Sequence, residues 1–199
     1  MPRAALREAR CCVCGDSGMG KTTLLHRYVR NKFDPGIEST IGAAYLCRAV
    51  SPECRLHLWD TAGQERYEAL CPMYLRNANI VLVCVEASQL SARAAEASAR
   101  RWVTTSRNAS DDAVLVLVAT KADLLPPAEL YRARAALAEL AARLGVRHHH
   151  LVSSKTSEGC PRFSEDLDTL ALDIAPRSRD CAVALPPPAV SEEWGCCWY

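Results

Sequence analysis

The sequence has almost no net charge and no long apolar run. Lysine and arginine total 24 against 23 acidic residues, so the net charge is +1. No basic stripe with interleaved aromatic residues occurs, which excludes non-specific binding to a nucleic-acid backbone. No apolar run approaches the roughly 18 residues of a membrane span. Residues 1–9 are charged and lack the apolar core of a signal peptide, so we expect the chain to remain in the cytosol.

Cysteine, by contrast, is abundant. Eleven cysteines are scattered along the chain, and in a reducing compartment we expect them to pack as small apolar side chains rather than to form disulfides. Cys11 and Cys14 have a C-x-x-C spacing, but on a strand these two side chains point to opposite faces and cannot chelate one zinc ion. The three histidines at 148–150 also diverge along a predicted strand, which disfavours a metal site there.

Residues 15–22, GDSGMGKT, match the pattern G-x-x-x-x-G-K-[ST] that wraps the phosphates of a nucleotide. Glycines let successive N–H groups turn toward an anion, and the next helix begins with its positive dipole end facing it. Lys21 adds a charge for the β- and γ-phosphates, and Thr22 adds a hydroxyl for Mg²⁺. The flanking sequence agrees with this motif, because residues 10–14 predict a strand and residues 23–30 predict a helix.

The remaining elements alternate between strand and helix. The apolar runs 80–85 and 114–119 are continuous, as expected for parallel strands covered on both faces. A helix over 89–105 is predicted between them, with Trp102 as a packing residue. Further strands are predicted over 45–50, 55–59 and 149–152, and further helices from Pro126 to a cap at Gly145 and over 158–174. We therefore predict an α/β fold, a doubly wound, mostly parallel six-stranded sheet with about five helices, whose ligand binds at the carboxyl ends of the strands.

Two motifs stand at that edge. Residues 60–65, DTAGQE, follow one strand, and residues 120–123, TKAD, follow another. The Asp123 carboxylate can accept hydrogen bonds from N1–H and the exocyclic amine of guanine, whereas N1 of adenine is an acceptor. That mismatch costs about 1–3 kcal/mol when it is buried, so Asp123 predicts guanine. The stem of Lys121 can lie along the base.

In combination, these motifs resemble the small GTPases of the Ras superfamily, in the Rab branch. Residues 41–45, IGAAY, and 59–67, WDTAGQERY, closely match Rab signatures. Residues 38–45 together with 72–74 are most similar to early-endosomal Rabs. The resemblance covers about residues 10–174. It implies the small G-protein form of the P-loop NTPase fold, with a GTPase domain over 1–175 and a flexible tail over 176–199.

The resemblance implies GTP/GDP and Mg²⁺ as cofactors, and a hydrolysis that is slow without an activating protein. Asp60 and the switch threonine Thr40 would serve the metal, the N–H of Gly63 would reach the γ-phosphate, and Gln64 would orient the attacking water. Taken singly, Asp60, Thr40 and Gln64 could equally be ordinary turn or surface residues. The expected catalytic residues are Gln64, Lys21 and Gly63; the metal ligands are Thr22, Thr40 and Asp60; the nucleotide contacts are Asp16, Ser17, Gly18, Met19, Gly20, Lys21, Thr22, Thr23, Phe33, Thr40, Gly63, Thr120, Lys121, Asp123, Ser153, Ser154 and Lys155.

The sequence departs from the family pattern at Thr120, where asparagine is usual, and at Ser154, where alanine is usual. Threonine supplies one hydroxyl in place of an amide, so we expect nucleotide retention to be weaker by about 1 kcal/mol. Two alternatives to an active switch stay open. One is a nucleotide-binding scaffold with impaired retention or hydrolysis. The other is a P-loop kinase for a small substrate, which Asp123 and residues 60–64 disfavour.

The tail from residue 176 is proline-rich and has no helical or strand period, so we expect a tether. Cys196 and Cys197 resemble sites for two geranylgeranyl groups, with unmodified cysteines as the alternative. Because basic and acidic residues offset each other in this tail, one lipid would anchor the chain only marginally and two would suffice.

The resemblance thus predicts a monomeric, membrane-anchored GTP/GDP switch in vesicular, endocytic traffic. It places the protein on the cytoplasmic face of early endosomes, with a cytosolic pool when extracted. Implied partners are effector proteins, a guanine-nucleotide exchange factor, a GTPase-activating protein, a prenylation escort protein and a GDP-dissociation inhibitor. Trp59 could instead be a core residue. The effector contacts implied by the resemblance are Ile41, Gly42, Tyr45, Trp59 and Tyr74.

Overall fold

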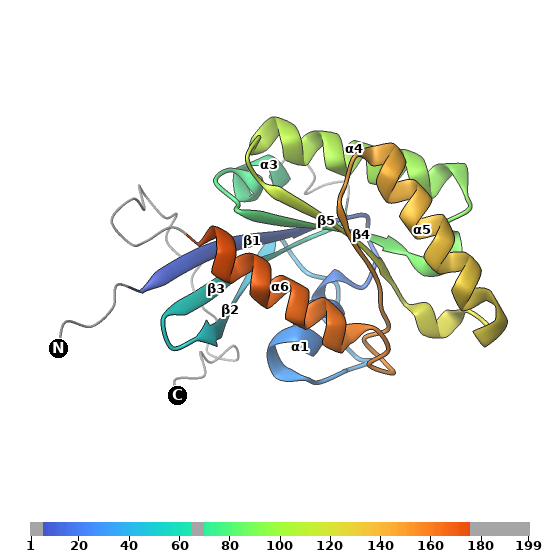
Figure 1. Ribbon diagram of the computed structural model, residues 1–199, viewed down its shortest axis with the longest axis horizontal. Coiled ribbons are helices and arrows are strands. Elements are labelled where there is room, and N and C mark those ends of the chain that lie inside the picture. Colours follow the sequence, from blue (N-terminus) through green and yellow to red (C-terminus); the bar gives the residue numbers. More distant parts are fainter. Residues whose placement is uncertain (1–5, 65–69, 176–199) are drawn as a thin grey trace.

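The computed structural model describes residues 6–64 and 70–175. A six-stranded sheet forms its centre, in the order β2-β3-β1-β4-β5-β6 (Figure 1). Only β2 runs antiparallel to its neighbour β3, and the other pairs are parallel. The strands are β1 Arg7–Cys14, β2 Ala43–Ser51, β3 Cys54–Thr61, β4 Ile80–Glu86, β5 Val114–Thr120 and β6 His148–Leu151. The predicted doubly wound α/β sheet is confirmed, while the tail 176–199 lies outside the described residues and its separation from the domain stays a prediction.

Helices cover both faces of this sheet. On one face lie α1 (Lys21–Arg30) and α6 (Cys160–Ile174), and on the other lie α3 (Cys71–Leu75), α4 (Arg93–Ala109) and α5 (Leu130–Leu144) (Figure 1). Three short 3-10 turns complete the described elements: η1 Ala87–Gln89, η2 Ala122–Leu124 and η3 Pro127–Glu129. Within the described residues, no helix has the length and apolarity needed to cross a bilayer.

A hydrophobic core lies on each face of the sheet, and alternate residues of β1 pack into one core or the other. Cys11 packs with α1 and α6, whereas Cys12 and Cys14 pack with α3, α4 and α5. The prediction that Cys11 and Cys14 point to opposite faces is therefore confirmed. Burial raises the pKa of all three thiols, so they pack as neutral, apolar groups.

The predicted helix over 89–105 was wrong by four residues at each end. Residues 87–89 form η1, and Ala92 has an extended backbone with φ −83° and ψ 135°, so α4 begins at Arg93 and continues to Ala109. The alanine-rich sequence contains no capping signal at the observed start, and α4 has no side-chain cap there. The helix predicted from 158 begins at Cys160, with Pro161 in its first turn as expected.

Phe163 joins α6 to α1 and β6. Its side chain is 1% exposed, and its ring centroid lies 5.9 Å from that of Tyr28 and 5.5 Å from that of His150, edge to face in both cases. Such aromatic pairs add to the free energy of burial. This ring therefore links α6 both to α1 and to the edge strand β6.

We predict that Phe163→Ala lowers the free energy of unfolding by about 3–5 kcal/mol, because it removes a buried ring and leaves a cavity. Tyr131→Ala is the matched control, since Tyr131 is 82% exposed, and it should change stability by less than about 0.5 kcal/mol. Urea denaturation followed by circular dichroism measures both. Equal destabilisation by the two variants would contradict this account of the core.

Candidate functional site

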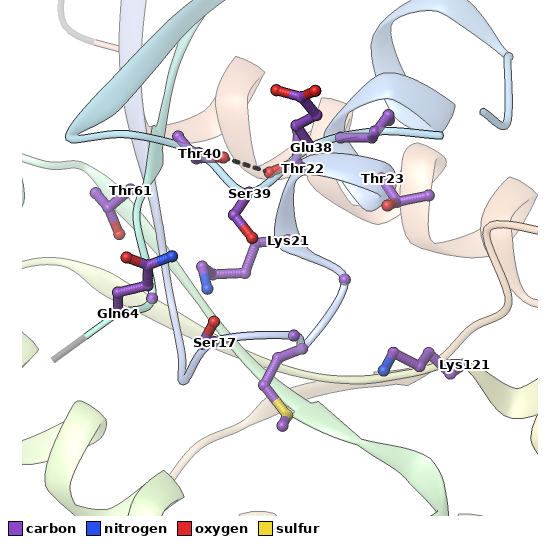
Figure 2. A pocket seen from close by; sticks show the side chains of 15 residues that line it. Ser17, Lys21, Thr22, Thr23, Glu38, Ser39, Thr40, Thr61, Gln64 and Lys121 are labelled. Atoms are coloured by element: carbon purple, nitrogen blue, oxygen red, sulfur yellow. Dashed lines mark hydrogen bonds between the residues drawn. The ribbon is translucent and has the colours of Figure 1, made fainter. Parts of the chain in front are cut away.

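The loops after β1, β3, β5 and β6 meet at the carboxyl edge of the sheet, where two adjoining cavities lie. The loop cavity, of about 230 Å³, is lined by residues 17–23, 37–40, Thr61, Gly63, Gln64 and Lys121 (Figure 2). The strand-end cavity, of about 170 Å³, is lined by Gly20, Thr23, Phe33, Thr120, Lys121, Asp123, Leu124, Ser154 and Lys155. Because Gly20, Thr23 and Lys121 line both cavities, the two form one elongated site.

The loop between β1 and α1 has the shape that the glycine motif predicts. Gly15 has φ +140°, and a Cβ there would stand 2.5 Å from the carbonyl oxygen of Cys84, so only glycine fits between the loop and β4. Lys21 is 6% exposed, and its Nζ donates to the carbonyl oxygens of Gly15 at 2.9 Å and Asp16 at 2.8 Å. No side chain caps the N-terminus of α1, whose N–H groups therefore suit an anion.

Three oxygen-bearing side chains from three segments meet beside Lys21. The Thr22 hydroxyl donates to Asp60 Oδ2 at 2.6 Å, and the Thr40 hydroxyl lies 3.2 Å from the same oxygen. The two hydroxyls are 2.8 Å apart (Figure 2). These are the three residues that the sequence marked as metal ligands. Hydroxyl and carboxylate oxygens are the protein ligands that Mg²⁺ takes.

Asp60 is the least satisfied polar group in this cluster. It is 1% exposed, and its Oδ1 has no hydrogen-bond partner. Burial raises the pKa of this carboxyl, although bonds from Thr22 and Thr40 and the charge of Lys21 oppose the change. An orphaned buried carboxylate oxygen next to two hydroxyls is a position that a hard cation would satisfy.

Gly63 and Gln64 follow β3 at the rim of the loop cavity. A Cβ on Gly63 would lie 2.2 Å from Lys21 Nζ and 2.5 Å from the carbonyl oxygen of Asp16, so no larger residue can approach the loop as closely. Gln64 lines the same cavity (Figure 2). Residues 65–67 of the matched signature lie outside the described residues.

The strand-end cavity holds the residues expected around a base. Asp123 accepts a 2.5 Å hydrogen bond from the Ser153 hydroxyl, and Phe33, Ser154 and Lys155 line the same cavity. Ser153 does not line the cavity itself but fixes the carboxylate that does.

Glu86, at the end of β4, was missed by sequence reasoning. Its Oε2 forms a 2.8 Å ion pair with Lys121 Nζ. Hydrogen bonds from Lys121 and Ser88 lower the pKa of this carboxyl. The contact joins the last residue of β4 to the residue that follows β5, 35 positions away, and neither residue's local pattern indicates it.

Thr120 connects the strand-end cavity to the loop between β1 and α1. It is 2% exposed, and its hydroxyl lies 2.8 Å from the carbonyl oxygen of Met19 and 3.1 Å from that of Val85. One hydroxyl has one hydrogen, so it donates to one of these carbonyls at a time. The hydroxyl thus directly contacts the loop of residues 15–22, called the phosphate loop below.

The predicted effector residues differ in exposure. Ile41 is 81% exposed, whereas Trp59 is 6% exposed. The Trp59 ring packs 5.3 Å from that of Tyr45, and the Arg10 guanidinium lies 4.0 Å from its centroid. The alternative that Trp59 is a core residue is therefore favoured, and Tyr74 also packs partly against that core. Cys196 and Cys197 lie outside the described residues.

Asp16 also makes contacts that the sequence did not predict. Its carboxylate receives hydrogen bonds from Ser98, Arg101 and Trp102 of α4. Trp102 is 2% exposed and packs in the core as predicted, and its Nε1–H is in addition a donor to the phosphate loop.

Comparison with known proteins supplies the family. The family model described as "Ras of Complex, Roc, domain of DAPkinase" matches residues 10–123. GTP-binding protein YPT52 of Saccharomyces cerevisiae is 34% identical over 197 residues, covering 84% of this chain and 83% of that protein. The chain belongs to the Rab branch of the small GTPases. Ras-related protein Rab-22A of Homo sapiens is 35% identical over 130 residues (63% of this chain, 66% of that protein), and GTP-binding protein ypt5 of Schizosaccharomyces pombe is 42% identical over 115 residues (55% and 53%).

Membership in the Rab family confirms three predictions at family level. The chain is a GTPase, its ligand is a guanine nucleotide, and its domain is a GTP-binding switch. Asp123 in the strand-end cavity agrees with the guanine preference of a Rab domain.

We predict that Thr120→Val releases bound GDP about 5- to 10-fold faster, because valine has nearly the same shape but cannot donate to the carbonyl of Met19. Thr120→Asn should slow release, since an amide adds a second polar group. Thr169→Val is the matched control, because that exposed hydroxyl donates to the carbonyl of Glu165 within α6 and, among residues 6–64 and 70–175, to no other group. Release of a fluorescent GDP analogue into excess GDP gives the rates. An unchanged rate for both Thr120 variants would contradict a role for this hydroxyl.

Proposed function

We propose that this Rab GTPase is a membrane-anchored switch that binds GTP with Mg²⁺, hydrolyses it slowly and recruits effectors in endocytic vesicle traffic. One observation carries the proposal: Thr22, Thr40 and Asp60, from three separate segments, converge beside Lys21 at one end of a site whose other end holds Asp123. The endocytic assignment rests on the likeness of residues 38–45 and 72–74 to early-endosomal Rabs.

In this proposal the nucleotide spans both cavities. The guanine lies between Phe33 and the stem of Lys121, with its N1–H and amine donating to Asp123. The phosphates lie against the loop amides of residues 16–22 and the Lys21 cation. Mg²⁺ would be held by Thr22, Thr40 and Asp60, where it would neutralise charge on the β- and γ-phosphate oxygens. Asp60 Oδ1, buried and unpaired, supports this placement.

Hydrolysis requires little covalent help from the protein. Gln64 orients the attacking water, and the N–H of Gly63 and the charge of Lys21 stabilise the transferring phosphoryl group. Within the described part of the chain, no arginine lines the loop cavity. An activating protein that supplies one would accelerate turnover by about 10³–10⁵.

The switch itself is a change in the loops that carry Thr40 and Gly63. Contacts to the γ-phosphate hold both loops, and hydrolysis removes those contacts. Effectors would bind the GTP-bound form at Ile41, Gly42, Tyr45 and Tyr74. The buried Trp59 would support Tyr45 through their ring contact. Exchange factors and activating proteins would act at the same loops.

The remaining partners follow from the proposed lipid anchor. Two geranylgeranyl groups on Cys196 and Cys197 would hold the protein on the cytoplasmic face of early endosomes. A prenylation escort protein would deliver it there, and a GDP-dissociation inhibitor would extract a cytosolic, monomeric pool. A nucleotide-binding scaffold with impaired retention or hydrolysis is less favoured, because Lys21 and Gln64 line the loop cavity and Asp60 accepts a hydrogen bond from Thr22 beside it.

We predict that Gln64→Leu slows single-turnover GTP hydrolysis by about 10- to 100-fold, because the attacking water loses its orientation. GTP should remain bound, since Gln64 does not anchor the nucleotide. Quenched-flow assay of phosphate from preloaded protein gives the rate, and chromatography of the released nucleotide identifies the base. Copurified ATP, or unchanged hydrolysis in the variant, would contradict the proposal.

We predict that Asp60→Asn raises the thermal midpoint of the nucleotide-free protein near neutral pH. Burial raises the pKa of Asp60 in the folded state, so this carboxyl favours folding when it is protonated at low pH. That contribution is lost as the pH rises through the folded pKa. The gain from asparagine should therefore shrink toward about pH 4, while Mg²⁺-dependent GTP retention is lost.

Calorimetry in EDTA between about pH 4 and 8 checks the stability part. Asp173→Asn is the matched control, because Asp173 is exposed on α6, and it should leave the midpoint unchanged. A lower midpoint for Asp60→Asn at neutral pH would show that the buried carboxylate stabilises the fold instead.

A further inference from the structure

Residues on one turn of α4 donate hydrogen bonds to the side chain of Asp16 in the phosphate loop. Ser98 Oγ donates to Asp16 Oδ2 at 2.5 Å, while an Arg101 guanidinium nitrogen at 2.5 Å and Trp102 Nε1 at 2.8 Å donate to Oδ1. Positions 98, 101 and 102 share one helix face, as residues three and four apart do. Asp16 does not line the loop cavity within the described residues. Its carboxylate is therefore bound to α4 and not directed at the ligand.

The backbone of the same residue organises the catalytic groups. The carbonyl oxygen of Asp16 accepts hydrogen bonds from Lys21 Nζ at 2.8 Å and from the N–H of Met19 at 3.4 Å. Gly63 packs so closely on this carbonyl that a Cβ there would lie 2.5 Å from the oxygen. Whatever fixes the side chain of Asp16 therefore also fixes the carbonyl on which Lys21 and Gly63 depend.

The ion pair between Arg101 and Asp16 also affects how an anion binds in the loop cavity. A carboxylate next to a polyphosphate repels it, and Arg101 forms an ion pair with this carboxylate while its own side chain is 46% exposed. Burial raises the pKa of Asp16, but the bonds from Ser98 and Trp102 and the charges of Arg101 and Lys21 outweigh it, so the pKa is lowered overall. The Asp16 carboxylate therefore stays ionised near neutral pH, and the charge of Arg101 must offset it whenever a polyphosphate binds beside it.

We propose that Ser98, Arg101 and Trp102 are positioning residues that hold the phosphate loop through Asp16 and set the rate at which the nucleotide leaves. This inference rests on the proposed function, since it concerns release of guanine nucleotide from the loop cavity. It gives α4, a helix that contributes nothing to the lining of either cavity within the described residues, a role in the lifetime of the bound state.

The test measures release of a fluorescent GDP analogue from the full-length protein into excess GDP. Arg101→Ala should release it about 10-fold faster, because the carboxylate loses a charged hydrogen bond. Arg101→Lys should restore most of the retention by keeping the charge. Arg100→Ala is the matched control: this neighbouring arginine pairs with Glu96 at 3.0 Å and not with Asp16, so release should match the parent protein.

Trp102→Phe tests the buried donor, because it removes the Nε1–H and keeps most of the apolar surface. Its effect should combine with that of Arg101→Ala to less than the product of the two, since both act on one carboxylate. Thermal midpoints separate positioning from general destabilisation, and Arg101→Ala, at an exposed position, should leave the midpoint unchanged while release accelerates. Should Trp102→Phe fail to fold, the two Arg101 variants still decide the question.

The outcomes distinguish a failure of the proposed function from a failure of the positioning role of α4. A parent protein that takes up no guanine nucleotide would overturn the proposed function. A parent protein that holds GDP, with Arg101→Ala releasing it at the rate of Arg100→Ala, would leave the proposed function intact and overturn the positioning role of α4. Equal release from Arg101→Lys and Arg101→Ala would overturn the part of the proposal that rests on charge.

Discussion

The parallel pairing of β1 with β3 is the constraint on which the site depends. Val13 lies in register with Asp60, so the start of the phosphate loop and the buried carboxylate end at the same edge of the sheet. Thr22 reaches Asp60 because α1 begins directly after the loop, and Thr40 reaches it because β2 runs back antiparallel to β3. A shift of this register by one residue would turn Asp60 to the other face of the sheet and remove the oxygen cluster.

The phosphate loop is held from both faces of the sheet. On one side α1 continues from it and packs Leu24 and Leu25 into the core shared with α6. On the other side Trp102 packs in the opposite core and also bonds Asp16. A loop rich in glycine loses much conformational freedom on ordering, and two rigid attachments supply the order that its own sequence cannot. The loop's geometry therefore depends on two packed cores and not on the motif alone.

The sequence predicted those parts of the molecule that local patterns determine. Continuous apolar runs located β4 and β5, because a strand covered on both faces has no polar side. Spacing located residues 15–22, 60–64 and 120–123, because the binding groups of each motif lie within a few consecutive residues. The start of α4 was wrong because the alanine-rich stretch carries no signal that distinguishes a 3-10 turn from the first helical turn.

Contacts between distant residues were beyond sequence reasoning for a different reason. Asp16 meets its partners on α4 across 82 to 86 positions, and Glu86 meets Lys121 across 35. Such pairs have no period and no fixed spacing. They follow from the order of strands in the sheet, which sets the loops beside one another only after the chain has folded.

Besides the exposed Glu38, which lines the loop cavity, four acids lie at or next to the two cavities, and their partners indicate what each one is for. Arg101 neutralises Asp16 and Lys121 neutralises Glu86, so neither needs a ligand. Asp60 and Asp123 form no ion pair with residues 6–64 or 70–175 and are bonded by hydroxyls instead. Asp60 is 1% exposed, and a buried carboxylate bonded only by neutral donors remains under-compensated in a low dielectric. Asp123 is partly buried and has one hydroxyl donor. Of these four acids, the two without an ion pair are those at which a ligand gains most by bringing positive charge or donors. This agrees with the proposed metal ion at Asp60 and the proposed guanine N–H groups at Asp123.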